Sequence, residues 1–131
     1  MQEHQKKILV VEDNDDIRSL ESRILRADGY EVLSASNLDD AFTILKEHHI
    51  DLVLLDIVLE DQSGLDILTE MRMGSNRKLR RIPVIMLTSK STVEDIDYAL
   101  ALGADSYLVK PFRGRLLTER VHSILDQLIS A

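Results

Sequence analysis

The sequence predicts an α/β fold in which five parallel strands alternate with five helices. Short apolar runs alternate with longer segments whose apolar residues recur at helical spacing. The runs at 52–55 and 82–87 are apolar without interruption, which is typical of parallel strands that helices bury on both faces. A chain of 131 residues suits one domain of ordinary size.

The first half of the chain contains three of the expected strands. Residues 7–12 (KILVVE) are rich in β-branched side chains, and residues 51–56 (DLVLLD) form a second buried run. Residues 30–36 (YEVLSAS) form a shorter strand between two amphipathic helices, at 16–29 and 38–49. The first of these helices is expected to end at its glycine, because glycine favours the position after a helix.

The second half repeats the alternation. Residues 64–73 and 92–103 are expected to be helices, the latter again ending on a glycine. Residues 82–89 form an apolar strand, with its proline near the start, where a missing N–H does least harm. Residues 106–110 form the last strand and 114–129 the last helix.

Apolar spacing also predicts which helix faces are buried. In the first helix these residues are Ile17, Leu20, Ile24 and Leu25, and in the last helix they are Leu117, Val121, Ile124, Leu125 and Leu128. Residues 74–81 (GSNRKLRR) show no such pattern and are expected to be an irregular, solvated connection. Its cations Arg77, Lys78, Arg80 and Arg81 are also suited to attracting an acidic partner.

Composition excludes several function classes. The net charge of −7 disfavours binding to nucleic acid or to an anionic membrane, and the absence of cysteine excludes disulfides and thiol catalysis. No apolar stretch approaches the length that spans a bilayer, and the polar N-terminus lacks the apolar segment of a signal peptide. A cytoplasmic location is expected.

Polar residues gather where the expected strands end. Ligands of an open parallel sheet bind beyond the carboxyl ends of its strands, so side chains at those ends are candidates for a site. They are Glu12, Asp13 and Asn14 after the first strand, Asp56 after the third, Thr88 after the fourth, and Lys110 followed by Pro111 after the fifth.

This set can handle a phosphoryl group. Clustered carboxylates repel one another, and Mg²⁺ relieves the repulsion with one or two carboxylates while keeping water and substrate oxygens as further ligands. A carboxylate oxygen of Asp56 could then attack phosphorus in line, with the cation and Lys110 neutralising the phosphoryl oxygens and the hydroxyl of Thr88 donating a hydrogen bond. The product is an aspartyl phosphate.

Each residue also has a purely structural interpretation. An isolated aspartate after a strand is often a turn or helix cap, and Glu12 and Asp13 could cap the next helix, a role expected for Asn14 or Asp15. Thr88 could fill space, Lys110 could be solvated, and Tyr107 could serve packing alone. The histidines (His4, His48, His49 and His122) are expected at the surface, and the adjacent pair is unsuited to a shared metal because neighbours on a helix point apart.

Taken together in this order, the motifs resemble those of the receiver domain of two-component response regulators, of the CheY-like kind. The resemblance covers nearly the whole chain, from KILVVEDN to the last helix. It is carried by the acidic pair Glu12-Asp13, Asp56 with Gly64 eight residues on, Thr88 in VIMLTS, Gly103-Ala104-Asp105, Tyr107, and the KPF of Lys110, Pro111 and Phe112.

The resemblance implies a role for each site residue. Asp56 is the phosphoacceptor, and Mg²⁺, with Mn²⁺ as an alternative, is bound by Asp13, Asp56, Glu12 and the backbone carbonyl of Val58. Lys110 pairs with the phosphoryl group, Thr88 moves to bond it, and Tyr107 turns inward to fill the vacated space. The Lys110–Pro111 peptide bond is expected to be cis.

The resemblance also implies the fold and the partners. The fold is a doubly wound, flavodoxin-like sheet of order 2-1-3-4-5, and residues 1–131 form a single receiver domain with a core at about 6–129. A sensor histidine kinase or a histidine phosphotransfer protein donates the phosphoryl group. The signal passes to an unidentified downstream target or effector domain through the fourth helix, fifth strand and fifth helix. The domain itself is not an enzyme beyond its own phosphorylation and dephosphorylation, and it binds no nucleic acid or membrane.

The chain departs from the family pattern near the site and on the output face. Glu60 stands where many members have proline, and Val58 and Lys90 occupy variable positions that tune dephosphorylation. On the output face, Asp105 and Arg120 match one ion pair of the receivers that dimerise to bind DNA. Ser106, Leu116 and Ile96 replace members of the other pairs, so a tight dimer of that type is not expected.

Two other function classes remain as alternatives. A phosphatase or phosphotransferase of the haloacid-dehalogenase type also uses a nucleophilic aspartate, but its nucleophile follows the first strand, where this chain has its acidic pair. A receiver-like binding scaffold would not need the complete set of chemical groups. The sequence leaves open a stand-alone regulator and a receiver cut from a longer protein.

Overall fold

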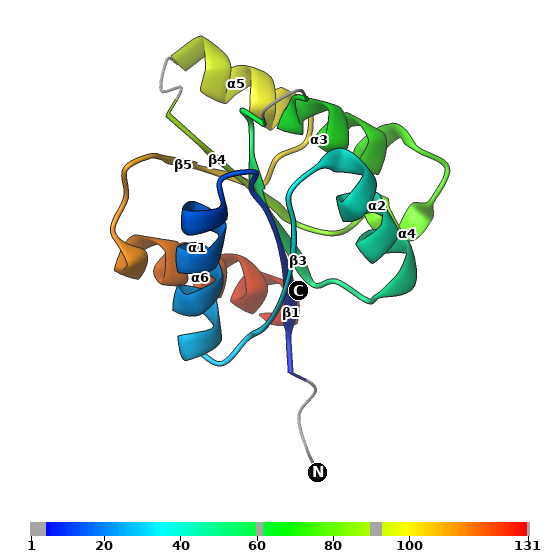
Figure 1. The fold of residues 1–131 in the computed structure, drawn as a ribbon. Helices are drawn as coiled ribbons and strands as arrows, with labels where there is room; N and C mark the ends of the chain where they lie inside the picture. Colours follow the sequence, from blue (N-terminus) through cyan, green and yellow to red (C-terminus); the bar gives the residue numbers. More distant parts are fainter. Residues whose placement is uncertain (1–4, 60–61, 90–92, 131) are drawn as a thin grey trace.

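Five parallel strands form one sheet of order β2-β1-β3-β4-β5 in the computed structural model, which describes residues 5–59, 62–89 and 93–130 (Figure 1). The strands are β1 Lys7–Val11, β2 Glu31–Ala35, β3 Leu52–Asp56, β4 Val84–Thr88 and β5 Ser106–Val109. The predicted doubly wound fold and strand order are confirmed. All strands are parallel, so their carboxyl ends lie along one edge of the sheet.

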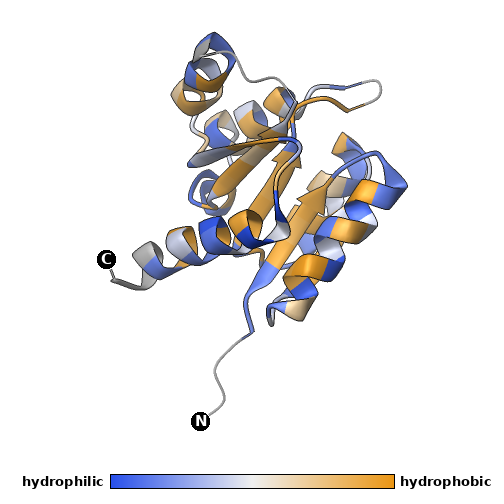
Figure 2. Cartoon of the chain, turned by 90° about the vertical axis from the view of Figure 1, so that its left-hand side faces the viewer, coloured by the Kyte–Doolittle hydropathy of each residue, from blue (hydrophilic) through white to orange (hydrophobic). Residues whose placement is uncertain are grey.

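The helices cover both faces of this sheet, as the apolar strands require. Helices α1 (Asp15–Ala27) and α6 (Gly114–Ser130) pack on one face, whereas α2 (Leu38–Glu47), α3 (Gly64–Met73) and α5 (Val93–Ala101) pack on the other (Figure 1). Successive residues of a strand therefore enter different cores, so that Val53 and Leu55 face α2, α3 and α5, whereas Leu52 and Leu54 face α1 and α6. Figure 2 shows these strands largely in orange, flanked by helices in which orange and blue residues alternate.

A sixth, short helix replaces the irregular connection expected at 74–81. Helix α4 (Arg77–Arg80) begins after Asn76, whose side chain accepts a hydrogen bond from the amide of Lys78. Its one apolar residue, Leu79, is buried. A single turn offers no repeating apolar pattern, which is why the sequence did not indicate it.

Helix α1 is rotated relative to its predicted face. Leu20 was expected to be buried but is 54% exposed, whereas Glu21 is only 3% exposed. The inward stripe runs from Ile17 through Glu21 to Leu25, at the i, i+4, i+8 spacing of one helix face. A carboxylate thus takes a core position.

Other local predictions hold. Asn14 caps α1 by accepting from the amide of Ile17, and the glycines expected to end two helices, Gly29 and Gly103, have φ of 97° and 110°. The predicted face of α6 is buried at Leu117, Val121, Ile124 and Leu125. The histidines expected at the surface are exposed at His48, His49 and His122. His4 and the side chain of Leu128 lie outside the described residues, within which no helix is long and apolar enough to cross a membrane.

Candidate functional site

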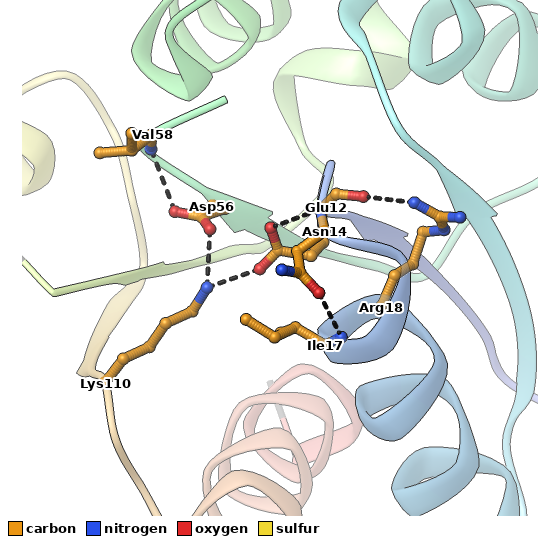
Figure 3. A network of polar contacts seen from close by, with 7 residues as sticks. All are labelled: Glu12, Asn14, Ile17, Arg18, Asp56, Val58 and Lys110. Carbon is orange, nitrogen blue, oxygen red and sulfur yellow. Dashed lines mark hydrogen bonds and ion pairs between the residues drawn. The ribbon is translucent and has the colours of Figure 1, made fainter. Parts of the chain in front are cut away.

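Asp56 is a buried carboxylate at the carboxyl end of the central strand β3. Its side chain is 8% exposed, in a strand that is otherwise wholly apolar. Burying an ionised group is unfavourable unless it is paired and hydrogen-bonded. Both conditions are met: Oδ2 lies 2.7 Å from Nζ of Lys110, and Oδ1 accepts from the amide of Val58 at 3.0 Å (Figure 3).

Glu12 meets the same lysine from the neighbouring strand. It follows β1, is 2% exposed, and its Oε1 lies 2.5 Å from Nζ of Lys110. Its other oxygen, Oε2, accepts from the amide of Asn14 at 3.3 Å. One ammonium group therefore joins two buried carboxylates that come from β1 and β3 (Figure 3).

This arrangement changes the ionisation of its members. Burial raises the pKa of Glu12 to about 7, because the contact with Lys110 offsets only part of that effect and the nearby charge of Asp56 adds to it. Burial alone would lower the pKa of Lys110, yet its hydrogen bonds to Asp56 and Glu12 hold that pKa above the usual value. Two buried carboxylates share one ammonium group, so the site is short of positive charge.

A shallow depression of about 440 Å³ adjoins the carboxylates. It is lined by Asp13, Asn14, Val58 and Leu59. Within the described residues, no three His, Asp or Glu side chains are grouped so as to hold a metal by themselves. Mg²⁺ does not need three, because it takes one or two carboxylates and completes its shell with carbonyl oxygen and water. An all-oxygen donor set beside a site short of positive charge fits this ion.

Gly64 allows the loop after Asp56 to return close to its own origin. Its amide donates to the carbonyl of Ile57 at 2.8 Å, and a Cβ placed on it would lie 2.0 Å from the backbone oxygen of Asp56. Any larger residue would push the start of α3 away from the end of β3. The glycine eight residues after Asp56 is thus explained by packing against the site.

Thr88 and Tyr107 lie on β4 and β5. Thr88 ends β4, is fully buried, and its carbonyl accepts from the amide of Lys110 at 2.8 Å. Tyr107 in β5 is half-buried, and burial, together with the charges of Asp95 and Asp56, raises its pKa.

Of the predicted site residues, Asp56 and Glu12 are both in direct contact with Lys110. Asp13 lines the adjoining depression, as does Val58, whose amide also donates to Asp56. The Lys110–Pro111 peptide bond is cis, as the resemblance implies. Glu60, which stands where many family members have proline, and Lys90, one of the two variable positions, lie outside the described residues.

Two further residues of α1 belong to the site and were missed from the sequence. Arg18 donates from Nη1 to the carbonyl of Glu12 at 2.9 Å and from Nη2 to the carboxylate of Asp15 at 2.6 Å. Glu21 is buried, and neither of its carboxylate oxygens has a hydrogen-bond partner among the described residues. Burial and the charge of Glu12 raise its pKa to about 7. The spacing of Glu21 from Ile17 and Leu25 was the available signal for its inward position.

Comparison with known proteins agrees with this geometry. Residues 8–122 match the family model described as the response regulator receiver domain. A probable transcriptional regulator, ycf27 of Porphyridium aerugineum, is 38% identical over 126 residues, which are 96% of this chain and 50% of that protein. The chain spans about half the length of the curated relatives it matches.

Solved structures show the same likeness. The chemotaxis protein CheY4 of Vibrio cholerae superposes with a TM-score of 0.85 at 28% identity, covering 92% of this chain and 98% of that one. The receiver domain of the sensor histidine kinase PA1611 of Pseudomonas aeruginosa has a TM-score of 0.83 at 28% identity, covering 94% and 99%. That structure has a magnesium ion coordinated in its active-site cleft.

The family match covers most of the chain, and the solved relatives share its fold. The chain belongs to the response regulator receiver domain family of two-component signalling.

Proposed function

We propose that this chain is a phosphorylation-dependent switch that accepts a phosphoryl group on Asp56 from a sensor histidine kinase or a histidine phosphotransfer protein. The observation that carries the proposal is the placement of Asp56. It is a buried carboxylate at a strand end, paired with Lys110 and adjoining the depression that Asp13 and Val58 line. Buried carboxylates with a specific charge partner cluster at functional sites.

The proposed step is an in-line transfer. A carboxylate oxygen of Asp56 forms a bond to phosphorus while the bond from phosphorus to the donor's imidazole nitrogen breaks, and the imidazole keeps the electron pair. Lys110, now held by Asp56 and Glu12, is placed to pair with the phosphoryl oxygens. Thr88 and Tyr107 are the residues expected to respond, by donating to the phosphoryl group and by turning inward.

The divalent ion belongs in this proposal as a bound cofactor. Asp13, Asp56, Glu12 and the backbone carbonyl of Val58 would hold Mg²⁺, or Mn²⁺ in its place. When bound, the ion supplies positive charge that offsets the repulsion between the carboxylates and the incoming phosphoryl oxygens. Arg18, through the carbonyl of Glu12, fixes the backbone from which two of these ligands project.

The output of the switch is a shift in the population of two arrangements of one face of the domain. This face is formed by α5, β5 and α6, which are the fourth helix, fifth strand and fifth helix expected from the sequence. We infer that a downstream target or effector domain reads this face, and that the domain works in the cytoplasm without binding nucleic acid or membrane. The rival phosphatase class has its nucleophile after the first strand, whereas Asp56 follows β3, so the switch is preferred.

Incubation with acetyl phosphate and Mg²⁺ tests the proposed function. Intact mass measurement should show the gain of one phosphoryl group, because a small phosphodonor needs only the domain's own site. The gain should be absent when the metal is chelated. A protein that stays unmodified in the presence of Mg²⁺, or that hydrolyses a phosphomonoester with turnover, would contradict the proposal.

Replacing Asp13 by alanine should weaken Mg²⁺ binding severely and leave the domain folded. In the metal-free protein, the substitution removes one carboxylate from a site that is short of positive charge. The melting temperature of the variant should therefore be unchanged or higher than that of the parent protein. Calorimetric Mg²⁺ titration and thermal melts without metal provide the two measurements. Asp16→Asn, an exposed neighbour on α1, is the control. A large loss of stability in Asp13→Ala would instead identify a structural cap.

A tight symmetric dimer is not expected on phosphorylation. Asp105 is already held within the chain by Arg72 at 3.0 Å and by the amide of Val84 at 2.8 Å, and Arg120 donates to Ser106 at 2.6 Å. An exposed ion pair between two copies would be worth only about 0–1 kcal/mol, and it would have to replace these contacts. Sedimentation with and without beryllofluoride should show monomer. A dimer that Arg120→Ala abolishes would refute this.

A further inference from the structure

A pocket of about 460 Å³ lies at the edge of the sheet opposite the candidate site, where the end of α2 meets α4 and the starts of β3 and β4. Its floor is apolar and includes Leu45, Leu79 and Ile82, none more than 8% exposed. Its rim carries three exposed cations, Arg77, Lys78 and Arg81. The length of one strand, about 15 Å, separates this edge from Asp56.

The cations are presented on a turn that the fold holds in place. Leu79 anchors α4 from below, and Arg72 of α3 donates from Nη1 to the carbonyls of Leu79 and Arg80 at 3.3 and 3.2 Å. The same guanidinium donates to the carbonyl of Gly103 at 2.9 Å and to the carboxylate of Asp105. The rim is therefore tied to α3 and to the start of β5, unlike the solvated loop that the sequence suggested.

The cations of the rim are available to a partner. Across the described residues, none of the three cations takes part in a salt bridge. The one carboxylate that lines the pocket, Asp51, is engaged by the amide of Lys7 at 2.8 Å and by His49 at 3.0 Å. On a chain of net charge −7, this is a local positive patch above an apolar floor.

We propose that this pocket docks an acidic segment of another protein that carries one apolar side chain. The apolar side chain would be buried on Leu45, Leu79 and Ile82, while flanking carboxylates meet Arg77, Lys78 and Arg81. Exposed cations spread around an apolar floor suit a peptide better than a small anion, which needs buried donors directed at one point. The overall charge of −7 opposes a DNA duplex. The site goes beyond the phosphoacceptor function and leaves the Asp56 edge open.

The test uses a fluorescein-labelled peptide of aspartate and glutamate residues around a central leucine. Its anisotropy titration against the intact chain should show binding that weakens as salt is raised. Charge reversal of the rim, Arg77→Glu with Lys78→Glu and Arg81→Glu, should lower the affinity at least about tenfold. Changing the peptide leucine to serine should lower it about tenfold as well. Amide shifts should map to residues 48–51 and 77–83.

A matched variant separates a pocket from general attraction. Arg23→Glu with Arg113→Glu and Arg115→Glu changes the net charge equally at exposed positions elsewhere, and it should bind the peptide with less than about a threefold loss. An equal loss in both triple variants, or equal binding of the serine peptide, would overturn the proposal. So would preferential binding of a short DNA duplex through the rim. Acetyl phosphate labelling of Asp56 should be unaffected by the rim variant, so the two proposals can fail independently.

Discussion

Replacing Asp56 by asparagine should abolish labelling by acetyl phosphate completely, without unfolding the domain. The amide is nearly isosteric with the carboxylate, so its oxygen can still accept from the amide of Val58, and Lys110 keeps its contact with Glu12. What is lost is the nucleophile, because an amide oxygen does not attack phosphorus as a carboxylate does. Intact mass measurement after incubation with Mg²⁺ checks the first part, and a thermal melt checks the second.

The control for this prediction is another carboxylate near the same edge. Asp66 lies in the first turn of α3 and is exposed, so Asp66→Asn should be labelled like the parent protein. Glu12 is buried, shared with Lys110, and has a pKa raised to about 7, so it is the acid to examine if labelling persists. Equal labelling of Asp56→Asn would show that the nucleophile lies elsewhere in the cluster.

Replacing Glu21 by leucine should stabilise the domain, and more so as the pH rises. The pKa of Glu21 is raised from 4.5 to about 7, first by burial and then by the charge of Glu12. At about 1.4 kcal/mol for each pKa unit, ionising this group in the folded state costs about 3 kcal/mol. Leucine fits a helix as well as glutamate does and suits the buried face.

The pH dependence follows from the direction of the shift. A carboxyl whose folded-state pKa is raised favours the folded state below its unfolded pKa and loses that advantage as pH rises towards about 7. The gain from Glu21→Leu should therefore be about 3 kcal/mol at pH 8 and about 1 kcal/mol at pH 5.5, measured by urea denaturation. Glu21→Gln separates the effect of charge from the effect of burying an apolar side chain, since it removes only the pH-dependent part of the contribution of Glu21 to the free energy of unfolding. A gain that is independent of pH would show that the pKa of Glu21 is the same in the folded and unfolded states.

The main contacts of the site follow from a rule about parallel sheets, and so they could be predicted. Asp56, Glu12 and Lys110 each follow a strand, and parallel strands place their carboxyl ends on one edge. The prediction did not say which acid would meet the lysine, because that depends on how far a flexible side chain extends across the edge. In the structure Lys110 reaches both Asp56 and Glu12.

The features that could not be predicted depend on tertiary contacts of single residues. Helix α1 does not pack on the sheet with its most apolar face. The buried face is shifted by about one residue from it, and Glu21 therefore faces the core. Helix α4 has one buried residue and is held from outside by Arg72. Arg72 itself is a polar residue on an ordinary helix, and its carbonyl partners lie 7 to 31 residues away.

The path of Lys110 across the sheet has a consequence for local unfolding. The residue follows β5, a strand of four residues that pairs with β4 at the edge of the five-stranded sheet. Its ammonium group nevertheless contacts carboxylates that lie 54 and 98 residues earlier in the chain. Edge strands are paired on one side and open more readily than central ones, as amide hydrogen exchange detects. When β5 frays, the lysine leaves both carboxylates at once. Protection of the β5 amides therefore reports on whether the ion-paired cluster is closed.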